Sequence, residues 1–317
     1  MIKLVSDTID RQDINILIEW LQQDPIPKLT KGELTKELEK KWAKKLGTKY
    51  SVYVNSGSSA ILLTLAALKE SGKLKNNKIV VPALSWATDV SSPMLLGYDI
   101  TMCDCNLQDL SCDLEALEIQ FKENDPSVLI LVSPLGLVPK MEKVVDLCKK
   151  YNVLLLEDVC ESMGSKYNGK YLGSFGFASF FSMNLRSTDL QAFIGLRAID
   201  KLDKYSLKRR ENFKYYVNNL ITNKLKLEEK QNDYVSSFAI PVIHPRRNEV
   251  IQDLMDNKIE VRPLIAGNMA NKPMWKGSKK GLENCELVET QGFYIPNHQD
   301  LTKEDINKIV KIINKYG

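Results

Sequence analysis

The sequence predicts an α/β protein in which helices sandwich a mostly parallel sheet and a smaller α+β region follows. Two observations predict this fold class. Short apolar runs rich in β-branched residues alternate with helical stretches, as parallel strands covered on both faces do. After Arg186 one long helix and a mixture of shorter elements replace this alternation. The 317 residues are enough for one large domain and a smaller one.

Two amphipathic helices are expected first, around residues 9–20 and 34–46, because their apolar residues recur at helical spacing. Six strands and several intervening helices should follow. The strands are expected at residues 51–55, 78–83, 99–104, 127–132, 153–158 and 179–183, and the helices at 60–70, 113–122 and 141–150. Helical stretches therefore separate several of the expected strands.

The second part of the chain should begin with a helix over about residues 188–219. Further strands are expected at residues 237–243, 260–265 and 292–295, and helices at 246–257 and 302–315. This change of pattern predicts a large domain of residues 1–205 and a small α+β domain of residues 206–317.

Composition and charge exclude several classes of protein. Lys and Arg total 44 against 40 for Asp and Glu, and the basic residues are scattered, so no nucleic-acid partner is expected. The longest apolar stretch, residues 128–138, is too short to span a bilayer. The N-terminus has no apolar core of a secretory signal. Six cysteines without metal or redox spacing favour a reducing cytoplasm.

The first motif that can carry chemistry is Asn55-Ser56-Gly57-Ser58-Ser59-Ala60, which follows an expected strand and opens a helix. Gly57 permits a tight turn there. The N–H groups of a helix N-terminus and the hydroxyls of Ser58 and Ser59 suit a phosphate group. The same residues also form an ordinary N-cap and turn, which is the commoner use of such a motif.

The second motif covers residues 81–88 at the end of an expected strand, where open parallel sheets bind their ligands. Trp86 there can stack on a flat ring, and a packed core tryptophan is an equally good interpretation. The third motif places Glu157 and Asp158 at the end of an apolar run that should be a buried strand. A buried carboxylate needs a cationic partner, and helix capping or metal binding are the alternatives.

Together the three motifs resemble the pyridoxal-phosphate-dependent sugar aminotransferase family often called DegT, which has the aspartate aminotransferase fold. The resemblance runs from Asp7 to the C-terminus and favours the branch of nucleotide-sugar aminotransferases and 3-dehydratases. Residues 29–32, 157–170, 184–192, 262–268 and 292–298 also match the patterns of this family. The resemblance implies pyridoxal 5'-phosphate or pyridoxamine 5'-phosphate as cofactor, a nucleotide sugar and glutamate as substrates, and a homodimer.

The resemblance also implies a role for each matching residue. The backbone of Gly57 and the side chains of Ser58, Ser59 and Ser182 should hold the cofactor phosphate. Trp86 should stack on the pyridine ring, and Asp158 should pair with the pyridine nitrogen. Glu161 stands where many aminotransferases of the family have Gln, and Glu is typical of the dehydratase branch. Asn184 matches a residue that contacts the phosphate across the dimer.

One departure from the family concerns the catalytic residue. The family pattern continues from the strand of Ser182 to a catalytic Lys, or a His in the dehydratases, and reaches the Asn-x-Arg motif only several dozen residues later. Here Met183 leads directly into Asn184, so the resemblance implies an internal deletion at 183/184. Lysine attaches the cofactor and moves the proton, so its loss should remove the positioned base. Neither His244 nor His298 stands in a matching position.

The deletion should also leave a defect in the sheet. The family places an antiparallel strand from the missing segment between the strands of residues 179–183 and 51–55. We therefore expect either direct closure of these two strands or an exposed edge. Because two residues span at most about 7 Å, Ser182 and Asn184 should not both reach the cofactor site.

The resemblance implies a transferase by descent, which moves an amino group from glutamate to a keto nucleotide sugar and is impaired in this chain. A pyridoxamine-dependent sugar 3-dehydratase is the alternative enzyme, favoured by Glu161 and the motif around Trp86. A non-catalytic homologue that binds the cofactor or dimerises is an alternative of another class. A dinucleotide-dependent oxidoreductase is not expected, because no Gly-x-Gly-x-x-Gly follows a strand.

Overall fold

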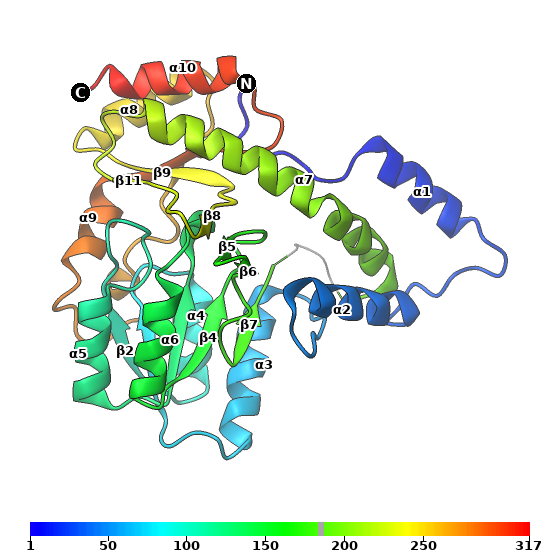
Figure 1. Ribbon diagram of the computed structural model, residues 1–317, viewed down its shortest axis with the longest axis horizontal. Helices are drawn as coiled ribbons and strands as arrows, with labels where there is room; N and C mark the ends of the chain where they lie inside the picture. Colours follow the sequence, from blue (N-terminus) through cyan, green and yellow to red (C-terminus); the bar gives the residue numbers. More distant parts are fainter. Residues whose placement is uncertain (183–186) are drawn as a thin grey trace.

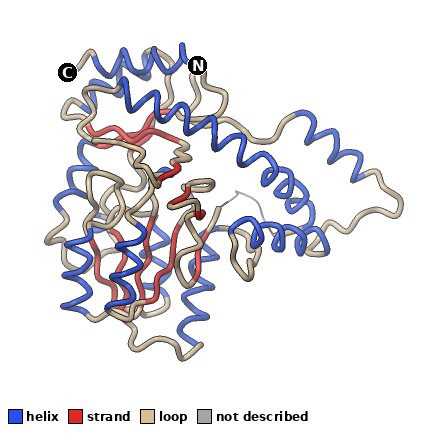
Figure 2. Tube along the Cα trace, viewed as in Figure 1, coloured by secondary structure: helices blue, strands red, loops and turns tan. Residues whose placement is uncertain are grey.

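The computed structural model describes residues 1–182 and 187–317, and a five-stranded sheet lies at its centre (Figures 1 and 2). The strand order is β2-β1-β3-β4-β7, and every neighbouring pair is parallel. The bounds are β1 Lys78–Pro82, β2 Asp99–Cys103, β3 Val128–Val132, β4 Leu154–Asp158 and β7 Ala178–Phe180. The predicted fold class is confirmed.

Helices cover both faces of this sheet. The helices α5 (Leu114–Asn124) and α6 (Met141–Lys150) pack side by side on one face, and α3 (Gly57–Glu70) and α4 (Ala87–Leu95) pack together on the other (Figure 1). All five residues of β3 are buried, as expected for a central strand covered on both sides. Burial of these apolar runs is the main favourable term for the fold.

The helix α7 (Asp189–Asn219) runs along the molecule from the neighbourhood of α2 (Glu33–Leu46) to α8 and α10 (Figure 1). The elements after it include an antiparallel sheet in the order β10-β11-β9, and β8, which pairs with the earlier strands β5 and β6 in a small sheet of the order β6-β5-β8. Their bounds are β5 Lys166–Tyr167, β6 Lys170–Tyr171, β8 Asp233–Tyr234, β9 Ala239–Ile243, β10 Arg262–Pro263, β11 Gly292–Pro296, α8 Arg247–Asp256, α9 Glu283–Gln291 and α10 Lys303–Asn314. Residue 205 lies inside α7, and the division into two domains at that position stays a prediction.

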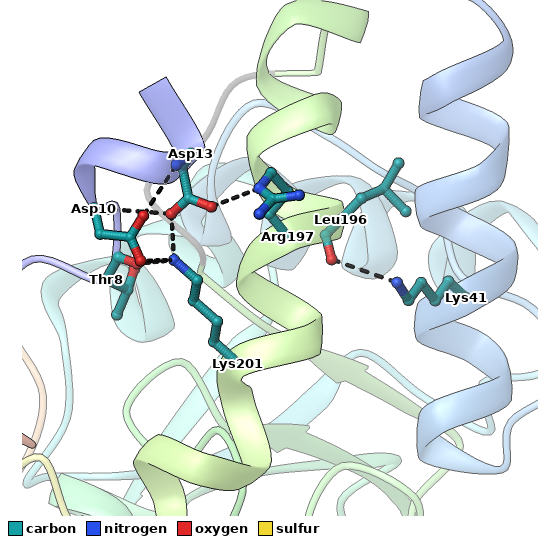
Figure 3. Close-up of polar contacts among 7 residues, drawn as sticks. All are labelled: Thr8, Asp10, Asp13, Lys41, Leu196, Arg197 and Lys201. Carbon is teal, nitrogen blue, oxygen red and sulfur yellow. Dashed lines mark hydrogen bonds and ion pairs between the residues drawn. The ribbon is translucent and has the colours of Figure 1, made fainter. Parts of the chain in front are cut away.

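The first helix, α1 (Arg11–Leu21), projects beside α7 and is attached to it by ion pairs (Figures 1 and 3). The carboxylate of Asp13, which is buried, accepts from Arg197 Nε at 2.5 Å and also pairs with Lys201. Burial alone would raise the pKa of Asp13, but hydrogen bonds from Lys201, the Asp10 backbone and Arg197 lower it to about 2. These ion pairs therefore hold α1 against α7 over the whole physiological pH range.

The predicted strand at residues 51–55 is wrong, because these residues form no strand in the structure. β7 is the last strand of its sheet, and none of the described residues provides a strand on its outer side. Of the two expected outcomes for the sheet, the exposed edge is therefore the one observed. A strand exists only where another strand supplies hydrogen bonds, and the apolar pattern around Val52 predicts burial without ensuring that partner.

Most of the other predicted elements are present with small shifts of their ends. The sequence patterns missed α4, α9 and the sheet β6-β5-β8, whose strands are two residues long. No helix in the described part of the chain combines the length and apolar character needed to cross a membrane.

Candidate functional site

The first turn of α3 has the geometry of a helix end that can bind an anion. Ser56 is the N-cap residue, and its Oγ accepts a hydrogen bond from the Ser59 N–H at 3.1 Å. The Ser58 hydroxyl lies 3.4 Å from Thr88 Oγ1 on α4. The N–H groups of Gly57 and Ser58 lie in the first turn, where backbone donors lack partners within the helix. A phosphate at this position would receive these donors and the positive end of the helix dipole.

Gly57 is the point at which three segments meet. A Cβ atom built on Gly57 would lie 2.8 Å from Cys160 Sγ, just beyond β4, and 3.6 Å from the Cβ of Ser182, just beyond β7. At the first distance a Cβ atom would force Cys160 to shift. Glycine therefore lets the start of α3 approach the carboxyl ends of β4 and β7 closely.

Trp86 follows β1 and is the N-cap residue of α4. Its side chain is 56% exposed, so the interpretation as a packed core tryptophan is wrong. The Trp86 N–H donates to Asp89 Oδ2 at 3.1 Å, which fixes the backbone while leaving the ring accessible. An exposed ring held by its own backbone is available for stacking on a flat ligand.

The two acids that end β4 serve different purposes. Glu157 accepts hydrogen bonds from the backbone N–H groups of Gly173, Phe175 and Gly176 at 2.6–2.7 Å, so it holds the turn that leads into β7. Successive strand residues face opposite sides, and Asp158 accordingly joins another set of residues. Asp158 is buried and accepts from the Cys160 N–H at 2.9 Å.

Three carboxyl groups gather at this end of the sheet: Asp158, Asp89 and Glu161. Burial first, and then the neighbouring charge of Asp158, raise the pKa of Asp89 well above its ordinary value. Asp89 is fully buried, and its Oδ1 has no hydrogen-bond partner. Burial raises the pKa of Glu161 to about 7, although the Leu135 N–H donates to this carboxylate at 2.9 Å.

No Lys, Arg or His of the described chain forms an ion pair with any of these three acids. Buried carboxylates without a cation are costly, and neighbouring negative charges add to that cost. A ligand carrying a protonated ring nitrogen would supply the missing positive charge. The acids, the exposed Trp86 ring and the anion-binding end of α3 therefore fit a flat, cationic ring that carries a phosphate.

The structure brings most of the predicted site residues to one end of the sheet. Gly57, Ser58 and Ser59 open α3, Trp86 follows β1, Asp158 and Glu161 follow β4, and Ser182 follows β7. Asn184 lies outside the described residues. Sequence reasoning missed Asp89 and Thr88, although an acid three residues after an N-cap position is the signal of a capping box.

Three basic side chains, those of His244, His298 and Lys166, have other partners. His244 Nδ1 accepts from the Arg246 N–H at 3.1 Å, and His298 Nε2 lies 3.1 Å from Lys3 O. Lys166 Nζ lies 4.3 Å from the ring centroid of Tyr171. These contacts give the three side chains structural roles away from the buried acids.

A model of the DegT/DnrJ/EryC1/StrS aminotransferase family matches residues 7–184 and, as a second segment, residues 181–314. The two segments meet directly after β7. The match therefore covers nearly all of the chain and divides at the junction where the sequence pattern departs from the family.

GDP-4-keto-6-deoxy-D-mannose 3-dehydratase of Yersinia pseudotuberculosis is 26% identical over 389 aligned positions, which include 98% of this chain and 98% of the relative. GDP-perosamine synthase of Escherichia coli O157:H7 is 24% identical over 337 positions, with 90% of this chain and 91% of the relative covered. Both alignments have more positions than the 317 residues of this chain. Each relative therefore contains residues that have no counterpart here.

Among solved structures, a crystal structure of GDP-4-keto-6-deoxymannose-3-dehydratase with a trapped PLP-glutamate geminal diamine is similar, with a TM-score of 0.88. The superposition covers 99% of this chain and 100% of that chain at 22% identity. At this identity the likeness establishes the fold.

Proposed function

The chain belongs to the DegT/DnrJ/EryC1/StrS aminotransferase family, and from this premise we propose that it binds pyridoxal 5'-phosphate or pyridoxamine 5'-phosphate without the residue needed for turnover. The buried acids Asp89 and Asp158 and the partly buried Glu161, which have no cation among the described residues, are the observation that carries the proposal. A protonated pyridine nitrogen beside Asp158 would provide that cation.

Each binding group would hold one part of the cofactor. The first turn of α3, with Ser58 and Ser59, would receive the phosphate, and Ser182 would approach it from β7. The exposed ring of Trp86 would stack on the pyridine ring. When bound, the cofactor supplies an electron-withdrawing ring for chemistry at an amino-bearing carbon. Asp158 would keep the ring nitrogen protonated, and Glu161, with a pKa of about 7, would hold or release a proton near neutral pH.

The proposed impairment rests on the junction after β7. The resemblance implies a catalytic Lys or His shortly after Ser182, and the two family matches meet at residues 181–184. With that segment missing, no base is positioned to move the proton. The parent reaction would be transamination between glutamate and a keto nucleotide sugar, or 3-dehydration of such a sugar. Relatives of both kinds are similar to this chain, and Glu161 favours the dehydratase.

Three further parts of the proposal rest on the sequence and on the family resemblance. We infer that the chain forms a homodimer, that it acts in the cytoplasm, and that residues 1–205 and 206–317 form separate domains. The alternative of a non-catalytic homologue is compatible with the same site, since binding needs only the residues that are present.

Titration of the purified protein with each cofactor, followed by quenching of tryptophan fluorescence, tests the binding. We expect saturable binding that dialysis reverses. Asp158→Asn should weaken it by at least tenfold, because the ring nitrogen loses its counter-charge, whereas Asp99→Asn, the same change at the exposed start of β2, should leave it unaltered. Wild-type protein that shows no binding would refute the proposal.

An assay with glutamate and GDP-4-keto-6-deoxy-D-mannose tests the impairment. Loss of a positioned base costs about 10²–10⁴ in rate, so we expect no measurable amino transfer or dehydration. Turnover that disappears in Asp158→Asn would show that another residue of this chain acts as the base.

A further inference from the structure

A second feature of the molecule is a cleft of about 660 Å³ beside the outer edge of β7. Its walls are formed by α3, β7, residues 48–54 and part of α2. The end of the cleft next to the start of α3 is lined by Ser56, Gly57 and Ser182. The cleft is not lined by Trp86, Asp89 or Asp158. The cleft therefore adjoins the proposed cofactor site without being part of the carboxylate cluster.

The surface of this cleft is strongly apolar. Tyr50, Val52, Leu63 and Phe177 all line it, and each is more than half exposed. Large apolar side chains that gather on one exposed surface indicate a binding site for another molecule. Isolated exposed apolar residues would need no such explanation, but these four come from three separate segments and meet in one cleft.

The backbone of β7 faces the cleft with its unpaired side. The Val159 N–H, directly after β4, donates to Phe180 O at 3.1 Å, and Ala178 and Phe180 pair with Leu156 and Asp158 of β4. The backbone groups of Ala178 and Phe180 therefore face β4. Because backbone groups of successive strand residues point to opposite sides, the Ser179 N–H and C=O point away from β4 and toward the cleft, which Ser179 lines. An edge with free N–H and C=O groups is a template for pairing with another strand.

We propose that this cleft binds an extended polypeptide strand of a partner molecule, which pairs with the outer edge of β7 and packs alternate apolar side chains against α3. A polypeptide strand presents N–H and C=O groups at the spacing of the β7 edge. The proposal does not depend on the cofactor and stands whether or not the cofactor binds.

Two observations favour a separate strand over other occupants. The family matches meet directly after β7, and relatives have additional residues. The outer edge of β7 is therefore compatible with a polypeptide segment that this chain does not supply. A second copy would hold its own β7 in the same recess between α3 and residues 48–54. Two recessed edges do not meet, so the strand must come from a protruding or unfolded segment.

Fluorescence anisotropy with a labelled peptide of alternating Val and Thr, ending in Lys for solubility, tests the proposal directly. We expect saturable binding to the wild-type protein. The same peptide methylated at every backbone nitrogen keeps its side chains but loses its donors, and it should bind at least tenfold more weakly. Equal binding of both peptides, or binding of neither, would overturn the proposal.

Variants of the edge provide the second arm of the test. Ser179→Pro removes the outward N–H and should weaken peptide binding at least tenfold, whereas Ser179→Ala keeps the N–H and should bind as the wild type does. If Ser179→Pro does not fold, Leu63→Glu places a charge on the apolar wall and should weaken binding to a similar extent. Peptide binding unchanged by Ser179→Pro or by Leu63→Glu contradicts the proposal. Self-association that either variant abolishes would assign the edge to a second copy instead.

Discussion

The first turn of α3 and its later turns lie in different environments. At its N-terminus, Gly57 lies so close to Cys160 that a Cβ atom would force Cys160 to shift, and buried acids surround the site next to it. Farther along the helix, Leu63 and Ala67 line a wide apolar cleft beside β7. The first region is tightly packed and polar, and the second is open and apolar. The difference agrees with the proposal that the cofactor-binding groups remain, while the polypeptide that the family resemblance places beside β7 is missing.

Glu157 and Asp158 are neighbours in β4 but serve these two different regions. Replacing them should give the largest difference in stability. Glu157→Ala would leave three backbone N–H groups without an acceptor in the turn that leads into β7. Each unsatisfied group costs about 1–3 kcal/mol, so we expect destabilisation by several kcal/mol in urea unfolding. Asp158→Ala, one residue away, removes only one such acceptor and should cost far less. Equal losses of stability would contradict the division.

The difference in packing along α3 gives the next effect. Gly57→Val would force a side chain against Cys160, and overpacking typically costs about 1–3 kcal/mol. Ala67→Val introduces the same residue on the same helix, but at an exposed position in the cleft, and should change stability by less than about 0.7 kcal/mol. Thermal unfolding of both variants measures the contrast. Similar melting temperatures would show that the start of α3 is less constrained than the structure indicates.

The carboxylate cluster should make stability depend on pH. The pKa of Asp89 is raised in the folded state, so its contribution is fully present below the unfolded pKa of 3.8 and is lost as pH rises through the folded pKa. Asp89→Asn removes this loss, so the melting temperature should fall less between about pH 4 and pH 8. In free energy of unfolding, the pH-dependent loss should be smaller by on the order of 1 kcal/mol at pH 7. Asp99→Asn, at an exposed position, serves as the control. An unchanged pH profile for Asp89→Asn would contradict the proposed cluster.

The exposed ring of Trp86 should give the smallest effect. Stacking of aromatic rings contributes about 0.5–1.5 kcal/mol, so Trp86→Ala should weaken cofactor binding by roughly twofold to tenfold. Its effect on unfolding should be small, because more than half of the side chain is exposed. Trp86→Phe should restore most of the affinity. Loss of stability without loss of affinity would mean that the ring serves packing and not binding.

The sequence predicted features that depend on one segment of the chain, and it failed for features that depend on contacts between distant segments. The apolar run that ends in Glu157 and Asp158 predicted β4 almost to the residue, because burial on both faces leaves a continuous pattern. The strand expected around Val52 failed because strand formation needs a neighbour, and the pattern of a single segment does not contain that neighbour. Asp89 was missed because an acid near a helix start is usually a cap. Its place beside Asp158 arises only when α4 packs against the sheet.

The central claim is that this chain keeps the cofactor-binding groups but lacks the lysine that would attach the cofactor. The most direct test is intact-mass spectrometry after the protein is incubated with pyridoxal 5'-phosphate at the concentration that saturates binding and then treated with borohydride. We expect the mass of the unmodified chain, together with reversible binding in the titration. A stoichiometric reduced adduct on one lysine, absent in Asp158→Asn, would contradict the account and identify a residue that replaces the missing one.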